Sequence, residues 1–508
     1  MTLTSVNPVN GEVLAAMDET TPRELEDALA AASAAVPVLR AMSAAERGRW
    51  IRAVADALDS RSAELVRLAG RETGLPDVRL TGEVVRTTTQ LRFLAEHAET
   101  GRPFEPTIDR QDGSWLPGPR PDLRSLRSGI GVVLVFAASN FPFAFSVAGG
   151  DTASAWAAGC PVIVKTHPGH PLLSEAVAEV IRDTLVAQRV PSGAFATIRG
   201  FDVGRTALSD GRVSAGAFTG SVAGGRALAD LACRRPNPIP FFAEMGSVNP
   251  VIVTARASQE RADSITAGLA DSFLLGTGQF CTKPGLILLP AGSGITQRLA
   301  AILADRPACV MLSHDIRDRH RIAMRNFLAR GEIGLVATGQ QPGGDGAFEA
   351  ATVTSTTAKA LIAAPDTIAA EHFGPSTVLV TYESESELEA AIRVLPGSLT
   401  GTVQRGAGED VAGLVTALAE RAGRVLVDDW PTGVAVTWAQ FHGGPYPATS
   451  DARYTSVGTG AISRFLRTTA YQNVPDDALP RGLRNANPDR ILRRVDGVLT
   501  DEPIGEGA

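Results

Sequence analysis

The chain has 508 residues, more than one hydrophobic core usually serves, and about 150 residues per domain predicts two or three lobes. Its composition, 44% hydrophobic and 20% charged, is that of an ordinary globular protein, and a net charge of −7 provides no basic face for nucleic acid or anionic lipid. The start, M-T-L-T-S-V-N-P-V-N-G-E, lacks the features of a signal peptide. The four cysteines lie far apart in the sequence, at Cys160, Cys233, Cys281 and Cys309. Neither a disulfide framework nor a zinc cluster is therefore indicated, and we expect a cytoplasmic protein.

The predicted elements begin with amphipathic helices and continue with two α/β sets. In the first hundred residues, apolar residues recur at helical spacing through T-P-R-E-L-E-D-A-L-A-A-A and E-R-G-R-W-I-R-A-V-A-D-A-L. Residues 101–128 are rich in Pro, Arg, Asp and Gly and are expected to leave the core or to act as a linker. From Gly131 to Gly246, runs such as V-V-L-V-F and P-V-I-V-K alternate with helical patterns, which predicts a parallel sheet wrapped by helices. A second α/β set is expected from Asn249 to about Trp430.

The segment Ser128–Gly150 carries no charge and is long enough to span a bilayer, which takes about 20 residues. It nevertheless contains Asn140, Pro142 and several glycines, and it divides into a β-rich run, a turn and the start of a helix. We therefore expect a buried strand and loop here, and no membrane span.

Three stretches of the first α/β set suggest a dinucleotide site, and the third of them is F-A-A-S-N-F-P, which contains Asn140. The run F-T-G-S-V-A-G-G-R (Phe218–Arg226) follows a predicted strand and opens a predicted helix, so Gly220 and Ser221 would offer N–H groups and a hydroxyl to phosphate. A structural turn explains this run equally well, because it departs from the usual G-x-G-x-x-G fingerprint. In V-I-V-K-T-H-P, Lys165 stands at the carboxyl end of a buried strand and is either a ribose or phosphate contact or a solvated strand end.

Five residues are candidates for chemistry. Asn140, in F-A-A-S-N-F-P, offers an amide to an oxyanion or caps a turn. Glu244 follows a strand too apolar to face solvent, so its carboxylate must be paired, neutral or functional. Cys281, in G-Q-F-C-T-K-P-G, is a nucleophile or a buried inert thiol. Glu371, in E-H-F-G-P, and His442, in F-H-G-G-P-Y-P, would ordinarily be loop residues with local hydrogen bonds. No H-E-x-x-H or similar arrangement occurs, so no metal is expected.

Taken in order, N-F-P, V-K-x-H-P, F-T-G-S, E-M-G-S-x-N-P, G-Q-x-C and E-x-F-G-P resemble the motifs of the aldehyde dehydrogenase superfamily. The resemblance covers nearly the whole chain, from N-P-V-N-G-E at Asn7 to the tail. Within the superfamily, S-N-F-P-F-A-F-S-V-A-G-G-D-T-A-S-A and H-G-G-P-Y-P-A-T are similar to segments of the α-ketoglutaric semialdehyde (2,5-dioxovalerate) dehydrogenases. The NADP-dependent fatty aldehyde dehydrogenases are close relatives of that branch.

The resemblance implies a covalent mechanism. Cys281, as a thiolate, attacks the aldehyde carbon, and it needs help from its surroundings because a free cysteine has a pKa of about 8.5. The Asn140 amide and the Cys281 backbone N–H hold the oxyanion. Hydride then passes to nicotinamide C4, and Glu244 activates the water that hydrolyses the thioester, so we expect burial to raise its pKa. His442 is expected to face the pocket and to tune the thiolate or orient the substrate, with a structural role as the alternative.

The resemblance also implies how a nicotinamide cofactor is bound. Lys165 would contact the adenosine ribose or its 2′-phosphate, Ser221 the pyrophosphate and Glu371 the nicotinamide ribose. NAD-specific relatives often place a glutamate three residues after that lysine, where it repels a 2′-phosphate, whereas this chain has Pro168. NADP is therefore favoured, with NAD as the alternative. The expected cofactor-binding residues are Lys165, Thr166, Pro168, Arg205, Gly220, Ser221, Glu371 and Phe373.

The implied fold is the α/β aldehyde dehydrogenase fold. It has a Rossmann-like NAD(P)-binding domain (1–110 and 129–245), an α/β catalytic domain (246–460), and a small oligomerisation element with the tail (111–128 and 461–508). The family also implies a homodimer or homotetramer.

The favoured substrate is α-ketoglutaric semialdehyde, oxidised to 2-oxoglutarate, and its carboxylate requires an arginine or several other donors. Arg124, in P-D-L-R, is a candidate clamp, with an ion pair between subunits as the alternative. A fatty or other aliphatic aldehyde would instead need an apolar tunnel. The further alternatives are an acylating enzyme that uses coenzyme A, which the retained Glu244 disfavours, a cofactor-binding inactive homologue, and a cysteine hydrolase that uses Cys281 and His442.

Overall fold

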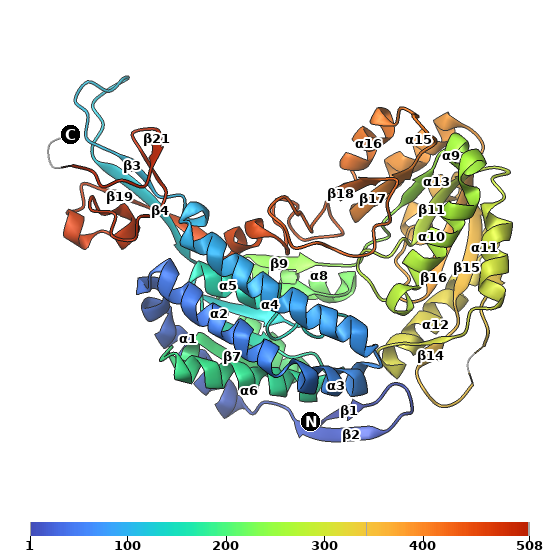
Figure 1. Cartoon of the computed structure of the whole chain (residues 1–508), viewed down its shortest axis with the longest axis horizontal. Coiled ribbons are helices and arrows are strands. Elements are labelled where there is room, and N and C mark those ends of the chain that lie inside the picture. The colour runs from blue at the N-terminus through green and yellow to red at the C-terminus, as the bar shows by residue number, and fades with distance from the viewer. Residues whose placement is uncertain (1, 342, 506–508) are drawn as a thin grey trace.

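The computed structural model of the protein describes residues 2–341 and 343–505, and three sheets organise them (Figure 1). The first is a parallel sheet in the order β7-β6-β5-β8-β9. All five residues of its central strand, V-V-L-V-F, are buried, as expected for a strand covered on both faces. Its strands are β5 (Val132–Phe136), β6 (Val162–Lys165), β7 (Phe195–Ile198), β8 (Val213–Thr219) and β9 (Phe241–Glu244).

Helices cover both faces of this sheet, and a hairpin of β1 (Thr2–Val6) and β2 (Val13–Asp18) lies beside them. The side chains of Thr21 and Ser43 cap the first two helices, each with a glutamate three residues later, which satisfies the free N–H groups of the first turn. The helices are α1 (Pro22–Ala41), α2 (Ala44–Ser60), α3 (Ser62–Thr73), α4 (Asp77–Glu99), α5 (Gly150–Ala158), α6 (Pro171–Ala187), α7 (Phe201–Ser209) and α8 (Val222–Cys233), with η2 (Ser192–Ala194).

The second sheet has seven strands in the order β13-β15-β16-β11-β10-β17-β18, and only the β13–β15 pair is antiparallel among the pairs described. Its strands are β10 (Val251–Val253), β11 (Leu286–Pro290), β13 (Gly334–Thr338), β15 (Thr352–Thr357), β16 (Ser376–Tyr382), β17 (Ser398–Gln404) and β18 (Ala422–Val427). The short strands β12 (Cys309–Val310) and β14 (Phe348–Glu349) pair separately. The helices that belong to this part are α9 (Ala255–Glu260), α10 (Ala262–Leu274), η3 (Leu275–Gly278), α11 (Ile295–Ala304), α12 (His314–Leu328), α13 (Ala358–Ala363), α14 (Pro365–Ile368), α15 (Glu385–Val394) and α16 (Ala412–Ala419).

The third sheet combines two distant parts of the chain in the order β19-β4-β3-β20-β21, and it projects from the end of the molecule farthest from the second sheet (Figure 1). Its strands are β3 (Thr107–Asp109), β4 (Leu123–Gly129), β19 (Leu466–Gln472), β20 (Arg493–Val495) and β21 (Val498–Thr500). The short helices η1 (Arg102–Phe104), η4 (Thr459–Phe465), η5 (Asp476–Ala478) and η6 (Arg481–Leu483) lie between its segments.

Arg124 is a structural residue of this third sheet, so the prediction of a substrate clamp is wrong. Its guanidinium is buried and pairs with Asp122 at 2.9 Å. It also donates to the Leu483 carbonyl at 2.6 Å and to the Asn485 side chain at 2.9 Å. These acceptors join β4 to the C-terminal segment, and they use the donors that a substrate carboxylate would need.

The predicted α/β class is confirmed, and the uncharged segment Ser128–Gly150 forms the end of β4, the buried strand β5 and the loop before α5. Within the described residues, no helix is long and apolar enough to cross a membrane. After β18, the chain returns to the first sheet, where the N–H of Met245 donates to the Ala448 carbonyl at 2.7 Å and Glu244 forms a β-bridge with Thr449. This return places the H-G-G-P loop beside the end of β9.

Candidate active site

Cys281 lies in the turn between η3 and β11, at the end of a loop that requires glycine. Gly276 and Gly278 have φ values of 57° and 66°, in the left-handed region that favours glycine. A Cβ atom on Gly278 would lie 2.1 Å from the Gly374 carbonyl oxygen, so this loop and the E-H-F-G-P loop are in direct backbone contact. The glycines therefore let the cysteine loop approach its neighbour closely.

The buried side chain of Asn249 holds the cysteine loop in place. Its amide nitrogen donates to the carbonyls of Cys281 at 2.8 Å and of Lys283 at 2.9 Å. Its oxygen accepts the Thr400 N–H at 3.1 Å, which ties the loop to β17. Asn249 was not among the predicted site residues, although its position in S-V-N-P, next to a buried strand, was a signal.

Three predicted residues meet at one point between the first two sheets. His442 Nε2 lies 3.4 Å from Cys281 Sγ and 2.8 Å from Glu244 Oε1. The hydroxyl of Ser456 donates to the other Glu244 oxygen at 2.5 Å. Glu244 and His442 are buried, and Cys281 is half-buried. The sequence analysis missed Ser456, because nothing in the local pattern around it points to a carboxylate so far away in the chain.

The pKa of Glu244 corrects an expectation. Burial alone would raise this pKa, but His442 and the hydrogen bond from Ser456 outweigh burial and hold it below its ordinary value. The expectation of a raised pKa considered desolvation and omitted the donors. Glu244 is therefore an ionised carboxylate at neutral pH.

The pKa of the Cys281 thiol is shifted in the opposite direction. Burial and the negative charge of Glu244 raise the pKa of Cys281 well above its ordinary value, and the positive charge of Arg86 opposes them. Before substrate binds, the site therefore contains a thiol beside an imidazole and a carboxylate. A base must take the thiol proton when sulfur attacks an electrophile.

Asn140 lies in the loop after β5 and faces the cysteine loop. Its side-chain nitrogen donates to the Gln279 carbonyl at 3.0 Å, and its own carbonyl accepts a bond from Arg79 at 2.6 Å. An amide nitrogen has two N–H groups, so one remains for a ligand beside Cys281. Its position suits an oxyanion donor.

Cys281, His442 and Glu244 are also residue types that bind metal ions, and their ligand atoms lie within 4.8 Å of one another. The arrangement nevertheless suits proton transfer, because the imidazole lies in space between the thiol and the carboxylate. That the site works without a metal stays a prediction.

The predicted cofactor residues follow the carboxyl edge of the first sheet. Gly220 and Ser221 are exposed at the start of α8, and Ser221 caps the helix by accepting the Gly224 N–H at 3.2 Å. The Gly220 N–H donates to the Glu244 carbonyl at 3.1 Å, so this helix start is attached to the strand that carries the carboxylate. An exposed helix N-terminus at this edge fits a pyrophosphate.

The other cofactor candidates differ in accessibility. Lys165 is half-buried at the end of β6, and burial lowers its pKa against the opposing effect of Glu19. Pro168 and Arg205 are exposed. Thr166 is buried, and its hydroxyl donates to the Ile198 carbonyl at 3.4 Å. The Lys165 side chain packs against α7 at Gly204, where a Cβ atom on the glycine would lie 3.0 Å from Lys165 Cγ. Lys165, Pro168 and Arg205 thus remain open to a ligand at this edge.

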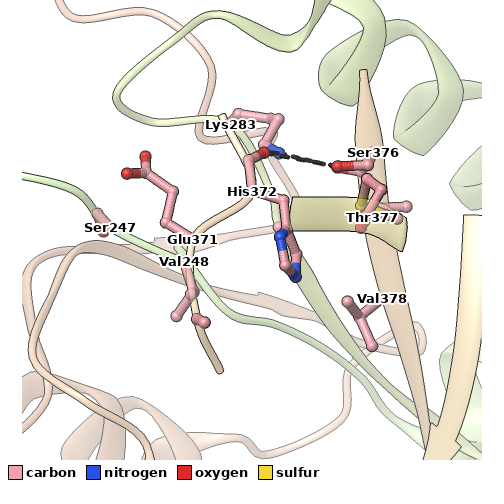
Figure 2. A pocket seen from close by; sticks show the side chains of 11 residues that line it. Ser247, Val248, Lys283, Glu371, His372, Ser376, Thr377 and Val378 are labelled. Atoms are coloured by element: carbon pink, nitrogen blue, oxygen red, sulfur yellow. Dashed lines mark hydrogen bonds between the residues drawn. The ribbon is translucent and has the colours of Figure 1, made fainter. Parts of the chain in front are cut away.

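Glu371 and Lys283 both line a small pocket beside the cysteine loop and the E-H-F-G-P loop (Figure 2). The Lys283 ammonium donates to the carbonyls of His372 at 2.6 Å, Gly374 at 3.1 Å and Ser376 at 2.8 Å. Burial lowers the pKa of Lys283 to about 8. Figure 2 shows the Glu371 carboxylate pointing away from the His372 ring.

The Glu371 carboxylate packs against a glycine. A Cβ atom on Gly246 would lie 2.2 Å from Glu371 Oε2, so the glycine after Met245 makes room for this carboxylate. Phe373, in the same loop, is half-buried. Glu371 is thereby positioned near the backbone that follows Glu244.

Comparisons with known proteins agree with these features. The model of the aldehyde dehydrogenase family matches residues 1–445. Alpha-ketoglutaric semialdehyde dehydrogenase 2 from Azospirillum brasilense is 41% identical over 505 residues, covering 98% of this chain and 96% of that protein. Alpha-ketoglutaric semialdehyde dehydrogenase from Acinetobacter baylyi is 40% identical over 465 residues, covering 90% and 87%.

Solved structures agree on the fold. PnpE from Pseudomonas sp. WBC-3 superimposes with a TM-score of 0.78 at 22% identity, covering 93% of this chain and 94% of that one. PnpE has also been solved in complex with nicotinamide adenine dinucleotide. The family match spans both α/β parts and every residue of the Cys281, His442 and Glu244 site, and the chain therefore belongs to the aldehyde dehydrogenase family.

Proposed function

We propose that this aldehyde dehydrogenase oxidises α-ketoglutaric semialdehyde to 2-oxoglutarate. The observation that carries the reaction type is the contact of a thiol, an imidazole and an ionised carboxylate, with His442 Nε2 at 3.4 Å from Cys281 and 2.8 Å from Glu244. The substrate is supported by the names of the two relatives at 41% and 40% identity.

In the first step, sulfur bonds to the aldehyde carbon. His442 takes the thiol proton in the tautomer in which Nε2, the nitrogen near Sγ, carries no proton, and the Nε2–H that results then faces Glu244, which stabilises the imidazolium. The oxyanion is held by the free N–H of Asn140 and by the Cys281 backbone N–H. Losing one such donor typically costs about 10²–10³ in rate.

The chain's residues fit a nicotinamide cofactor at the edge of the first sheet. Lys165 would bind the adenosine ribose or its 2′-phosphate, Ser221 the pyrophosphate and Glu371 the nicotinamide ribose. When bound, the cofactor would supply the hydride acceptor, and the acyl group would remain on Cys281 as a thioester. NADP is favoured because exposed Pro168 provides no carboxylate against a 2′-phosphate, and NAD is the alternative.

In the last step, the thioester is hydrolysed. Glu244 takes a proton from water, the water oxygen bonds to the acyl carbon, and the carbon–sulfur bond breaks to release the acid and regenerate Cys281. The low pKa of Glu244 keeps it ionised for this work at neutral pH. Ser456 fixes the carboxylate through its hydrogen bond to Glu244 Oε2.

The third sheet is proposed to be the oligomerisation element of a homodimer or homotetramer. Its exposed apolar side chains support this role: Trp115, Leu116, Leu123, Val498 and Leu499. The domain boundaries and the cytoplasmic location likewise stay predictions.

The substrate is tested by mixing the enzyme with α-ketoglutaric semialdehyde and either NADP or NAD. We expect reduced nicotinamide and an equal amount of 2-oxoglutarate, measured by absorbance and mass spectrometry, with no requirement for coenzyme A. A panel of aliphatic aldehydes serves as the comparison. Faster oxidation of a fatty aldehyde than of the semialdehyde, by kcat/KM, would contradict the proposed substrate.

Glu244→Gln should block hydrolysis of the thioester more than its formation. We expect a burst of up to one reduced cofactor per subunit, an acyl group retained on Cys281 in the intact mass, and a steady-state rate lowered by about 10³.

Ser456→Ala is the matched variant, because it removes one donor and keeps the carboxylate. Because that donor lowers the pKa of Glu244, its loss should raise this pKa and move the acid limb of kcat to higher pH. A burst and a steady-state rate reduced by the same factor in Glu244→Gln would argue against this assignment.

His442→Gln should slow the alkylation of Cys281 by iodoacetamide. Since the imidazole takes the thiol proton, the variant should react about tenfold more slowly at pH 7, and its alkylation profile should move to higher pH. His314→Gln, which changes a half-buried histidine on α12, is the control. Superimposable profiles for His442→Gln and the parent enzyme would remove this role.

Pro168→Glu should shift cofactor preference toward NAD. A carboxylate three residues after Lys165 would repel a 2′-phosphate, and we expect the KM for NADP to rise at least tenfold while the KM for NAD falls or stays constant. Pro168→Gln is the uncharged control. Equal effects of the two substitutions on NADP would contradict the electrostatic explanation.

A further inference from the structure

Arg86, on α4, is a cation with an unused donor in the wall of the active site. Its guanidinium carbon lies 5.2 Å from the centre of the Phe145 ring and 5.9 Å from that of Phe141. Its Nη1 atom is buried and has no hydrogen-bond partner among the residues that the structure describes. A buried donor without an acceptor is costly, so an acceptor is expected to bind there.

The rings beneath Arg86 connect it to the reacting thiol. Phe145 lies against the His442 ring, with the ring centres 6.1 Å apart, and His442 Nε2 is 3.4 Å from Cys281 Sγ. Phe141 packs edge-on against Phe280, the residue before Cys281, at 5.1 Å. A chain of ring contacts thus connects Arg86 with the Cys281 thiol.

The charged groups around Arg86 are two carboxylates and a second guanidinium. Glu83, one turn earlier on α4, accepts the N–H groups of Phe143 at 2.8 Å and Ala144 at 3.0 Å. Glu83 is within electrostatic reach of both Arg79 and Arg86, and Arg86 is also within reach of Glu244. Among the described residues, neither carboxylate accepts a hydrogen bond from Arg86, so its Nη1 donor stays available to an incoming acceptor.

Arg86 is also the arginine near the thiol with the fewest protein acceptors. Arg79 donates to the Asn140 carbonyl at 2.6 Å. Arg424, which approaches from β18, donates to the carbonyls of Pro431 at 2.6 Å and Gly433 at 3.0 Å. Among the described residues, no hydrogen bond from the Arg86 side chain is seen.

We propose that Arg86 binds the carboxylate of the substrate and selects for aldehydes that carry an acid group at the far end. A five-carbon chain spans about 5 Å between its ends, so a substrate attacked at its aldehyde by Cys281 would place its acid group about that far from the reacting carbon. A planar guanidinium can bind a carboxylate through two parallel hydrogen bonds, and the rings below restrict its orientation. This inference rests on the proposed function, because it assigns the recognition of that substrate's acid end.

The test compares substrates with and without the acid group. Arg86→Met and Arg86→Lys are assayed with α-ketoglutaric semialdehyde and with pentanal, which has the same number of carbons and no charge. 2-Oxovalerate, which keeps the acid end and lacks the aldehyde, is titrated as an inhibitor of pentanal oxidation. Arg92→Met is the matched control, since Arg92 is on the same helix and pairs with Asp56 and Asp59.

In Arg86→Met, the ratio of kcat/KM for the semialdehyde to that for pentanal should fall about 50-fold, mainly through the KM of the semialdehyde. The inhibition constant of 2-oxovalerate should rise by a similar factor. Arg86→Lys should lie between the parent and Arg86→Met, because it keeps the charge and loses the paired hydrogen bonds. Arg92→Met should leave both quantities unchanged.

Equal losses on both substrates, with an unchanged inhibition constant, would overturn the proposal and make Arg86 a structural residue. Failure of the proposed function has a different signature. If the parent enzyme prefers pentanal but 2-oxovalerate still inhibits it, and Arg86→Met relieves that inhibition, the carboxylate site is supported and the proposed substrate is wrong.

Discussion

The buried carboxylate of Glu244 is the constraint on which the site depends. An ionised group taken out of water is stable only if other groups replace its hydration. Here Ser456 donates a hydrogen bond to Glu244, and His442 Nε2 lies 2.8 Å from the other carboxylate oxygen. Both partners belong to the segment that returns from the second sheet to the edge of β9. The long irregular path after β18 thus brings together the residues of the reaction, which explains why it crosses from one α/β part to the other.

The pKa values of Glu244 and Cys281 are shifted in opposite directions, and this gives the two groups different protonation states. The carboxylate has a lowered pKa and the thiol a raised one, so the resting site holds one proton between sulfur and the imidazole–carboxylate pair. Since one nitrogen, His442 Nε2, faces both groups, it can donate a proton to Glu244 or accept one from Cys281, but not both at once. A neutral thiol is also less prone to oxidation before substrate arrives.

The α/β class could be predicted from local patterns, and the candidate site residues could be predicted from the ordered motifs that resemble the aldehyde dehydrogenase family. The alternation of apolar runs and helical patterns predicted the α/β class, and Cys281, Glu244 and Asn140 stand in short motifs at strand ends or in a glycine-rich loop. Ser456 and Arg86 leave no such signal, because each acts through partners distant in sequence. The expected rise in the Glu244 pKa was wrong for the same reason, since desolvation can be inferred from an apolar strand but donors from another segment cannot.

The cysteine loop and the loop that carries Glu371 are held together by direct contacts. Lys283, two residues after Cys281, binds three carbonyls of the loop that carries Glu371, and Gly278 touches the Gly374 carbonyl. An ammonium with three acceptors in a buried place resists displacement, because each lost bond would leave a polar group unsatisfied. The buried lysine thus ties the backbone that follows Cys281 to the backbone that follows Glu371.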